Sequence, residues 1–133
     1  MTLDVTSLLK KIEEAAQGLL FPSESDFPIE AFSYGEQEPT PEALLARSGT
    51  AAKDTIEQVE LASFFEGLTE AAEDASENDR KSAERFRALV ELIQTNLSDV
   101  RVYRLGQTDI EALVLGRHES GTWMGVRTNL VET

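Results

Sequence analysis

Most side chains in this 133-residue chain that could do chemistry are carboxylates, since the sequence contains 25 Asp and Glu, 12 Lys and Arg and one His. A carboxylate pair works as general acid and base only where both groups converge on one substrate. The adjacent pairs Glu13-Glu14 and Glu73-Asp74 do not meet this condition, because neighbouring residues on a helix do not face one another. A composition this acidic is enough to produce adjacent carboxylates, so these pairs give no basis for acid-base catalysis.

Two carboxylates differ from this background in their sequence context. Glu24 lies in the predicted acidic turn Ser23-Glu24-Ser25-Asp26, directly after a short apolar run, and we expect the last residue given, Thr133, to carry a free α-carboxylate. Carboxylate oxygens are the hard ligands that Mg²⁺ takes, and they can imitate phosphate oxygens. The plain alternatives are a local capping box between Ser23 and Asp26 that leaves Glu24 simply exposed, and an ordinary frayed terminus.

Other catalytic and ligand-binding classes have little support in the sequence. His118 lies between Arg117 and Glu119 in a predicted hairpin connection, and the chain has no cysteine and no second histidine for a metal site or a nucleophile pair. We expect His118 to lie on a surface turn. The glycine-rich signatures of phosphate loops are absent, and residues 121–125 lie between strands instead of opening a helix. We therefore expect no enzymatic activity and no cofactor.

The net charge of the chain limits the classes of partner that it can bind. A formal net charge of −13 makes nucleic acids and anionic membranes poor partners, because their phosphates would be repelled. Residues 12–46 and 54–79 contain no Lys or Arg, whereas basic residues gather in residues 80–87 and in the last three strands. A basic partner is the favourable one. The same charge also suits a solvated acidic protein without a specific site.

Length and composition indicate one domain over residues 1–133, since a chain of this size buries a sufficient core. The absence of cysteine fits a reducing compartment. The N-terminus lacks a secretory signal, and no window is apolar over the roughly 18 residues that span a bilayer. We expect a cytoplasmic monomer that does not bind membranes.

Four segments show helical spacing of apolar residues or begin with residues that favour helix starts. They are residues 4–17, 40–48, 62–68 and 82–97. Gly18 is well placed to end the first helix, and Thr40 and Pro41 suit the cap and first residue of the second. Residues 70–79 have almost no bulky apolar side chain, so we expect a loop or a solvated helical turn there.

Five segments have the composition of strands. They are residues 27–34, 55–61, 100–105, 110–116 and 123–130. Pro28 places the first near a sheet edge, and the short connections between the last three favour an antiparallel meander. We expect an α+β fold with Trp123, Phe64 and Phe65 in its core, because so small a domain needs its aromatic residues for burial. A last strand that runs to the end of the chain would hold the Thr133 carboxylate in place.

Several separated motifs, in order along nearly the whole chain, make the sequence resemble the nuclease A inhibitor family of small bacterial proteins. The motifs are Gly-Leu-Leu-Phe at residues 18–21, Ser-Glu-Ser at 23–25, Ser63-Phe64-Phe65, Thr95-Asn96-Leu97, Val102-Tyr103-Arg104-Leu105-Gly106 and Val131-Glu132-Thr133. The resemblance implies an α/β/α sandwich with a mainly antiparallel sheet, an N-terminal helix and a long helix in the C-terminal half. It also implies a protein that blocks a magnesium-dependent, sugar-non-specific endonuclease of DNA and RNA.

The resemblance further implies which residues contact the nuclease. Family members present a glutamate of the Ser-Glu-Ser turn and a C-terminal threonine carboxylate to the metal site of the nuclease, and these match Glu24 and Thr133. Both would contact the magnesium site of the partner and form no metal site of this chain. The other residues expected at the interface are Ser23, Ser25, Asp26, Asp74, Glu77 and Glu132.

One departure from the family pattern affects the expected affinity. The family carries a bulky aromatic residue in the acidic loop before the long helix, and residues 70–79 have none. We expect either weaker binding or a nuclease that differs at this contact. Two alternatives remain on the sequence alone: an acidic module that binds another basic protein, and a small hydrolase or ligand-binding domain, for which no nucleophile and base can be assembled.

Overall fold

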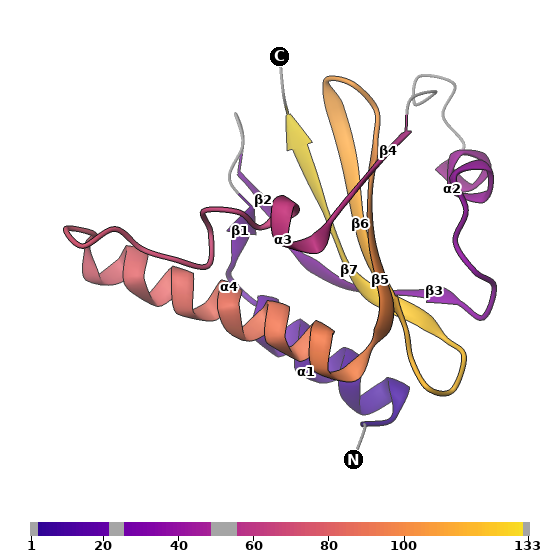
Figure 1. Ribbon diagram of the computed structural model, residues 1–133, viewed down its shortest axis with the longest axis horizontal. Coiled ribbons are helices and arrows are strands. Elements are labelled where there is room, and N and C mark those ends of the chain that lie inside the picture. Colours follow the sequence, from indigo (N-terminus) through magenta and orange to yellow (C-terminus); the bar gives the residue numbers. More distant parts are fainter. Residues whose placement is uncertain (1–2, 22–25, 49–55, 132–133) are drawn as a thin grey trace.

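A computed structural model describes residues 3–21, 26–48 and 56–131 of the chain (Figure 1). The helices of these residues are α1 (Val5–Ala16), α2 (Pro41–Ser48), α3 (Leu61–Phe64) and α4 (Glu77–Asn96). The strands are β1 (Leu20–Phe21), β2 (Phe27–Pro28), β3 (Glu30–Gly35), β4 (Ile56–Val59), β5 (Ser98–Leu105), β6 (Asp109–Arg117) and β7 (Trp123–Val131).

The main sheet is antiparallel and has the strand order β3-β7-β6-β5-β4, while β1 and β2 pair with each other in a separate ribbon. β5, β6 and β7 follow one another through short connections, so the predicted meander is confirmed. The register pairs Val114 with both Val102 on β5 and Val126 on β7. All three side chains are buried, and they form one row across the middle of the sheet.

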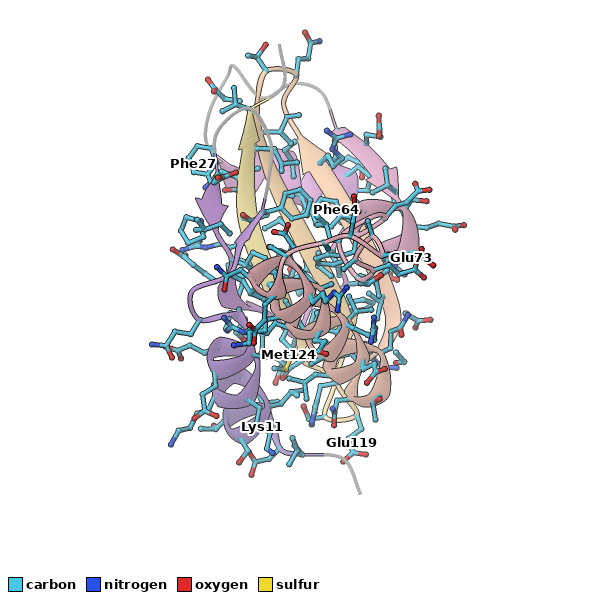
Figure 2. The ribbon with its side chains drawn as sticks, turned by 90° about the vertical axis from the view of Figure 1, so that its left-hand side faces the viewer. Lys11, Phe27, Phe64, Glu73, Glu119 and Met124 are labelled. Carbon is cyan, nitrogen blue, oxygen red and sulfur yellow. The ribbon has the colours of Figure 1, made fainter. Side chains whose placement is uncertain are left out.

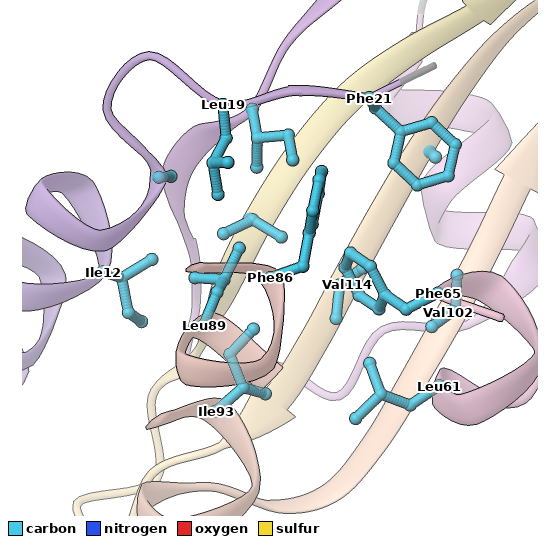
Figure 3. Packing of buried hydrophobic residues seen from close by; sticks show 14 of the residues in the cluster. Ile12, Leu19, Phe21, Leu61, Phe65, Phe86, Leu89, Ile93, Val102 and Val114 are labelled. Atoms are coloured by element: carbon cyan, nitrogen blue, oxygen red, sulfur yellow. The ribbon is translucent and has the colours of Figure 1, made fainter. Parts of the chain in front are cut away.

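Helices cover both faces of the sheet, which confirms the predicted α+β class and gives three layers (Figure 1). On one face α1 and α4 lie side by side, and Ile12, Leu89 and Ile93 are 0% exposed in the core between them and the strands (Figure 3). On the other face Leu44 of α2 packs against a smaller cluster that contains Trp123. Burial of these two apolar faces is the main stabilising term of the fold.

Local signals set the ends of the helices. The Asp4 carboxylate accepts a hydrogen bond of 2.7 Å from the Ser7 backbone N–H at the start of α1, and this bond lowers the pKa of Asp4. Gly18 has a φ of 79° just after the helix, a left-handed conformation that favours glycine. The Ala43 N–H donates to the Thr40 hydroxyl at 3.2 Å, so the predicted cap of α2 is confirmed.

The long helix begins five residues earlier than the sequence pattern predicts. α4 starts at Glu77, inside the segment expected as a loop or helical turn, because the Ser76 hydroxyl accepts a bond of 3.1 Å from the Asp79 N–H. Acidic side chains in the first turn also interact favourably with the helix dipole. The buried face of α4 begins only at Ala83, so the first turn and a half gives no apolar periodicity to detect.

The strand predicted over residues 27–34 is two strands. β2 leaves the main sheet and pairs with β1, with Phe21 opposite Phe27, whereas β3 pairs with β7 and forms one edge of the sheet. The predicted edge position is therefore confirmed for β3. Pro28 ends β2, where its missing N–H removes a donor from the ladder. β1 is too short to show an alternating pattern in the sequence.

His118 is not on the surface, contrary to the prediction, since only 3% of it is exposed. Its Nδ1 accepts a bond of 3.1 Å from the Ser120 N–H, so Nε2 carries the proton and donates it to the Leu3 carbonyl. The ring thus ties the β6–β7 turn to the segment before α1. Burial at a turn depends on this distant contact, which the local sequence does not reveal.

We expect His118→Ala to lower the free energy of unfolding by about 1–3 kcal/mol, because the packing of the buried ring and its bonds to the Leu3 carbonyl and the Ser120 N–H would be lost. Urea unfolding followed by circular dichroism would measure the change. Glu119→Ala is the control: this neighbour is exposed, and its loss should change stability by less than about 0.5 kcal/mol. Equal effects of the two substitutions would contradict a structural role for the ring.

Candidate nuclease-binding surface

Five of the eight residues expected at the interface lie outside the described part of the chain. They are Ser23, Glu24, Ser25, Glu132 and Thr133. Their attachment points are described: β1 ends at Phe21, and β7 ends at Val131. The position of these attachment points limits where the five residues can reach.

The attachment points lie close together at one end of the sheet (Figure 1). The ribbon of β1 and β2 contacts β7, and the buried Thr128 hydroxyl donates a bond of 2.9 Å to the Pro28 carbonyl. Phe21 and Leu130 belong to the same core cluster and line one surface hollow. The fold therefore brings together the ends of the two segments that carry the predicted carboxylates.

The three described interface residues, Asp26, Asp74 and Glu77, are all exposed. Asp26 directly precedes β2, next to the predicted turn. Asp74 and Leu20 of β1 line a second hollow of about 600 Å³, between the ribbon and the first half of α4. Glu77 begins α4 and lies 3.5 Å from Lys81, an exposed ion pair of little energetic weight. The acidic segment before α4 thus adjoins the ribbon through the second hollow.

Arginines of α4 hold neighbouring backbone in place. Arg80 donates to the Glu73 carbonyl at 2.6 Å, and Arg87 donates to the Thr69 carbonyl at 2.8 Å. Arg85 donates to the carbonyls that end α1, at Ala15 and at the residue that follows the helix. These cations are therefore directed at main-chain oxygens. Among the described residues of this segment, the carboxylates stay exposed and give the surface its negative charge.

The aromatic pair Phe64-Phe65 divides between core and surface. Phe65 is 2% exposed, as predicted, and Trp123 is 4% exposed in the smaller core cluster. Phe64 is only half-buried, and it lines the hollow that Phe21 and Leu130 share. Figure 2 shows Phe64 and Phe27 in the upper part of the molecule, toward the end of the sheet where β7 stops. The predicted core position therefore holds in full for Phe65, whereas Phe64 packs against the core cluster and stays partly exposed.

Two other properties of the described residues bear on function. No three or more of their His, Asp and Glu side chains come together in a way that could hold a metal ion. None of their helices has the length and apolar character needed to cross a lipid bilayer. Near the end of the sheet, the described residues offer separate exposed carboxylates and a mostly apolar hollow.

Comparison with protein families matches residues 6–133 to the family described as nuclease A inhibitor-like protein. The chain belongs to this family. Comparison with individually curated proteins gives no match. The family match begins at the second residue of α1, covers α4 and the whole main sheet, and includes the Ser-Glu-Ser motif and residue 133. The resemblance seen in the sequence is thus confirmed, and a nuclease is the partner that membership of this inhibitor-like family indicates.

We expect Thr128→Val to loosen the contact between β2 and β7, because valine keeps the shape of threonine but cannot donate to the Pro28 carbonyl. The loss should lower stability by about 1 kcal/mol and speed hydrogen exchange of the β1–β2 amides. Exchange followed by NMR would measure the second effect. Thr95→Val on the exposed face of α4 is the control and should leave ribbon exchange unchanged. Unaltered exchange in both variants would show that this bond does not position the ribbon.

Proposed function

We propose that this family member inhibits a magnesium-dependent, sugar-non-specific endonuclease by presenting the carboxylates of Glu24 and Thr133 to its metal site. The observation that supports this most directly is the contact between the β1–β2 ribbon and β7. Glu24 is three residues from Phe21 and Thr133 is two from Val131, so their Cα atoms lie within about 11 Å and 8 Å of these described ends. Two carboxylates with such short reach can enter one active site.

The inhibitor acts as a substrate mimic in this proposal. A nuclease active site is shaped to receive phosphate oxygens beside Mg²⁺, and a carboxylate offers the same hard, anionic oxygens. Ser23, Ser25 and Glu132 flank the two carboxylates in the sequence and would supply neighbouring polar contacts. The chain would itself be non-catalytic and would act as a monomer in the cytoplasm, where it would protect nucleic acid from the nuclease.

Exposed acidic residues would guide the encounter. Asp26 lies near the proposed contact, and Asp74 and Glu77 extend the negative surface toward α4. The groove in which a nuclease holds nucleic acid is basic, so opposite charges would accelerate association. The alternative function is an acidic module for a different basic protein, which the same surface charge would serve without any role for Glu24 or Thr133.

The decisive test is inhibition of nuclease A, the enzyme after which the family is named, in a DNA cleavage assay with Mg²⁺. We expect stoichiometric inhibition by the wild type and about 30-fold weaker inhibition by Glu24→Gln, the size of a typical interface hot spot. Removal of Thr133 moves the terminal carboxylate back by about 3.3 Å and should weaken inhibition similarly. Glu91→Gln, an equal charge change at an exposed site on α4, should have little effect.

Each other outcome has a defined meaning. No inhibition by the wild type at micromolar concentration would overturn the proposed inhibition of this enzyme. Full inhibition by Glu24→Gln and by the chain without Thr133 would favour the acidic module instead. Circular dichroism of each variant would exclude unfolding as the cause of a lost effect.

We also expect salt to act mainly on association. The net charge of −13 and the exposed carboxylates near the ribbon should make the association rate constant fall by roughly tenfold or more between low and high salt. The dissociation rate constant should change less, because short-range contacts at the centre of the interface set it. Stopped-flow measurements with nuclease A at several salt concentrations would test this. Equal association rates would contradict electrostatic steering.

A further inference from the structure

A hollow of about 340 Å³ opens at the end of the sheet where the ribbon, α3, β4, β5 and β7 meet. Most of its lining is apolar, and a guanidinium and a hydroxyl complete it. The lining residues are Phe21, Val59, Ser63, Phe64, Arg104 and Leu130. Its volume is at the lower end of the range for pockets that hold small ligands, which suits a single side chain.

The aromatic wall of the hollow is fixed before any partner binds. The rings of Phe21 and Phe64 stack with centroids 4.6 Å apart, and Phe64 meets the buried Phe65 edge-on at 5.0 Å. Phe65 in turn contacts Phe86 of α4, so the half-buried Phe64 belongs to a row of rings anchored in the core. A ring held in this way loses little conformational entropy when a partner covers it. Pre-organised aromatic side chains of this kind are typical interface anchors.

The charged residue in the lining, Arg104, bears on which kind of partner side chain the hollow can receive. Arg104 Nη1 lies 3.6 Å from Glu57 Oε1, and 22% of the Arg104 side chain is exposed against 61% of Glu57. The cation is thus the less exposed member of the pair and lines the hollow. Because Glu57 already pairs with Arg104 and the described lining residues include no carboxylate, a lysine or arginine would lose hydration there without gaining an ion pair of its own. An uncharged aromatic or aliphatic side chain would instead contact four apolar residues, and an aromatic ring would also meet the guanidinium favourably.

The position of the hollow connects it to the proposed contact. Phe21 is the last described residue before the acidic turn, and Leu130 is the residue before the end of β7. Two walls of the hollow therefore belong to the elements that carry Glu24 and Thr133. We propose that the hollow receives one uncharged aromatic or aliphatic side chain from the rim of the nuclease active site, with Phe64 as its main contact. This inference rests on the proposed inhibition of a nuclease.

Substitutions at the mouth of the hollow test the inference without disturbing the core. Ser63 lines the hollow and is exposed, and the preceding Ala62 is exposed on the same short helix but does not line it. We expect Ser63→Arg to weaken inhibition of nuclease A by about tenfold, because the long side chain occupies the hollow and adds a second cation. Ala62→Arg makes the same change of charge outside the hollow and should match the wild type within about twofold.

A second pair of variants distinguishes the occupant. Ser63→Glu should also weaken inhibition relative to Ala62→Glu if the occupant is apolar, since it would bury a carboxylate against an uncharged group. Stronger inhibition by Ser63→Glu would mean that a cationic side chain enters, and would overturn the choice of occupant. Phe64→Leu, which keeps an apolar side chain but removes the ring, should weaken inhibition by several-fold, with folding checked by circular dichroism.

The result for the wild type separates this inference from the function on which it rests. If the wild type inhibits and Ser63→Arg inhibits equally well, the hollow lies outside the interface and only this inference fails. If the wild type does not inhibit nuclease A, the proposed function fails and the inference fails with it. Light scattering that showed a wild-type dimer disrupted by Ser63→Arg but not by Ala62→Arg would assign the hollow to a second copy of the chain instead.

Discussion

The pairing of β7 with its neighbours is the constraint on which the rest of the molecule depends. β7 hydrogen-bonds to β6 on one side and to the edge strand β3 on the other, and it also accepts the β1–β2 ribbon through Thr128. Val126 and Leu130 bury one face of the strand against the helices, while Trp123 serves the smaller core on the opposite face. A strand held from both edges and both faces cannot shift its register without exposing all of these side chains.

The pairing of β7 with β6 is maintained along the whole strand. Val131 still pairs with Asp109 of β6, so the ladder continues to the last described residue. In the proposed function, this pairing fixes the point from which Glu132 and Thr133 extend. The ribbon likewise holds Phe21, the last described residue before the segment with Glu24. In the proposed function, the sheet and the ribbon therefore set the two points, Phe21 and Val131, from which the segments with Glu24 and Thr133 extend.

The basic side chains also hold parts of the fold together. Arg80, Arg85 and Arg87 direct their guanidinium groups at backbone carbonyls, and Arg101 binds Glu38 at 2.6 Å beside the Trp123 ring. This contact with Glu38 raises the pKa of Arg101 further above its ordinary value. Basic residues thus fasten segments of the chain to helices and strands. The negative surface that results is the one that the proposed electrostatic attraction to a basic nuclease groove requires.

Sequence patterns predict the elements of this fold better than their contacts. Periodicity and capping residues locate α1, α2, the start of the meander and the edge position of β3, because these depend on residues close in the chain. The ribbon depends on the pairing of Phe21 with Phe27, and the first turn of α4 depends on the cap at Ser76. The burial of His118 depends on its hydrogen bond to the Leu3 carbonyl. Hydrophobic periodicity reveals none of these three contacts. Family motifs point to Glu24 and Thr133, but not to the hollow, since its walls come from five separate elements.

Carboxylates alone make a poor centre for a tight interface. Removing a charged group from water costs free energy that its new partner must offset, so polar contacts supply more specificity than affinity. Affinity usually comes from a few apolar or aromatic anchors that exclude water around such contacts. Residues 70–79 offer no aromatic anchor, whereas Leu20 of the ribbon is 49% exposed and Phe64 packs against Phe21 of the ribbon. In the proposed interface, the apolar contribution would therefore come from the ribbon and α3, next to the described ends of the segments that carry Glu24 and Thr133.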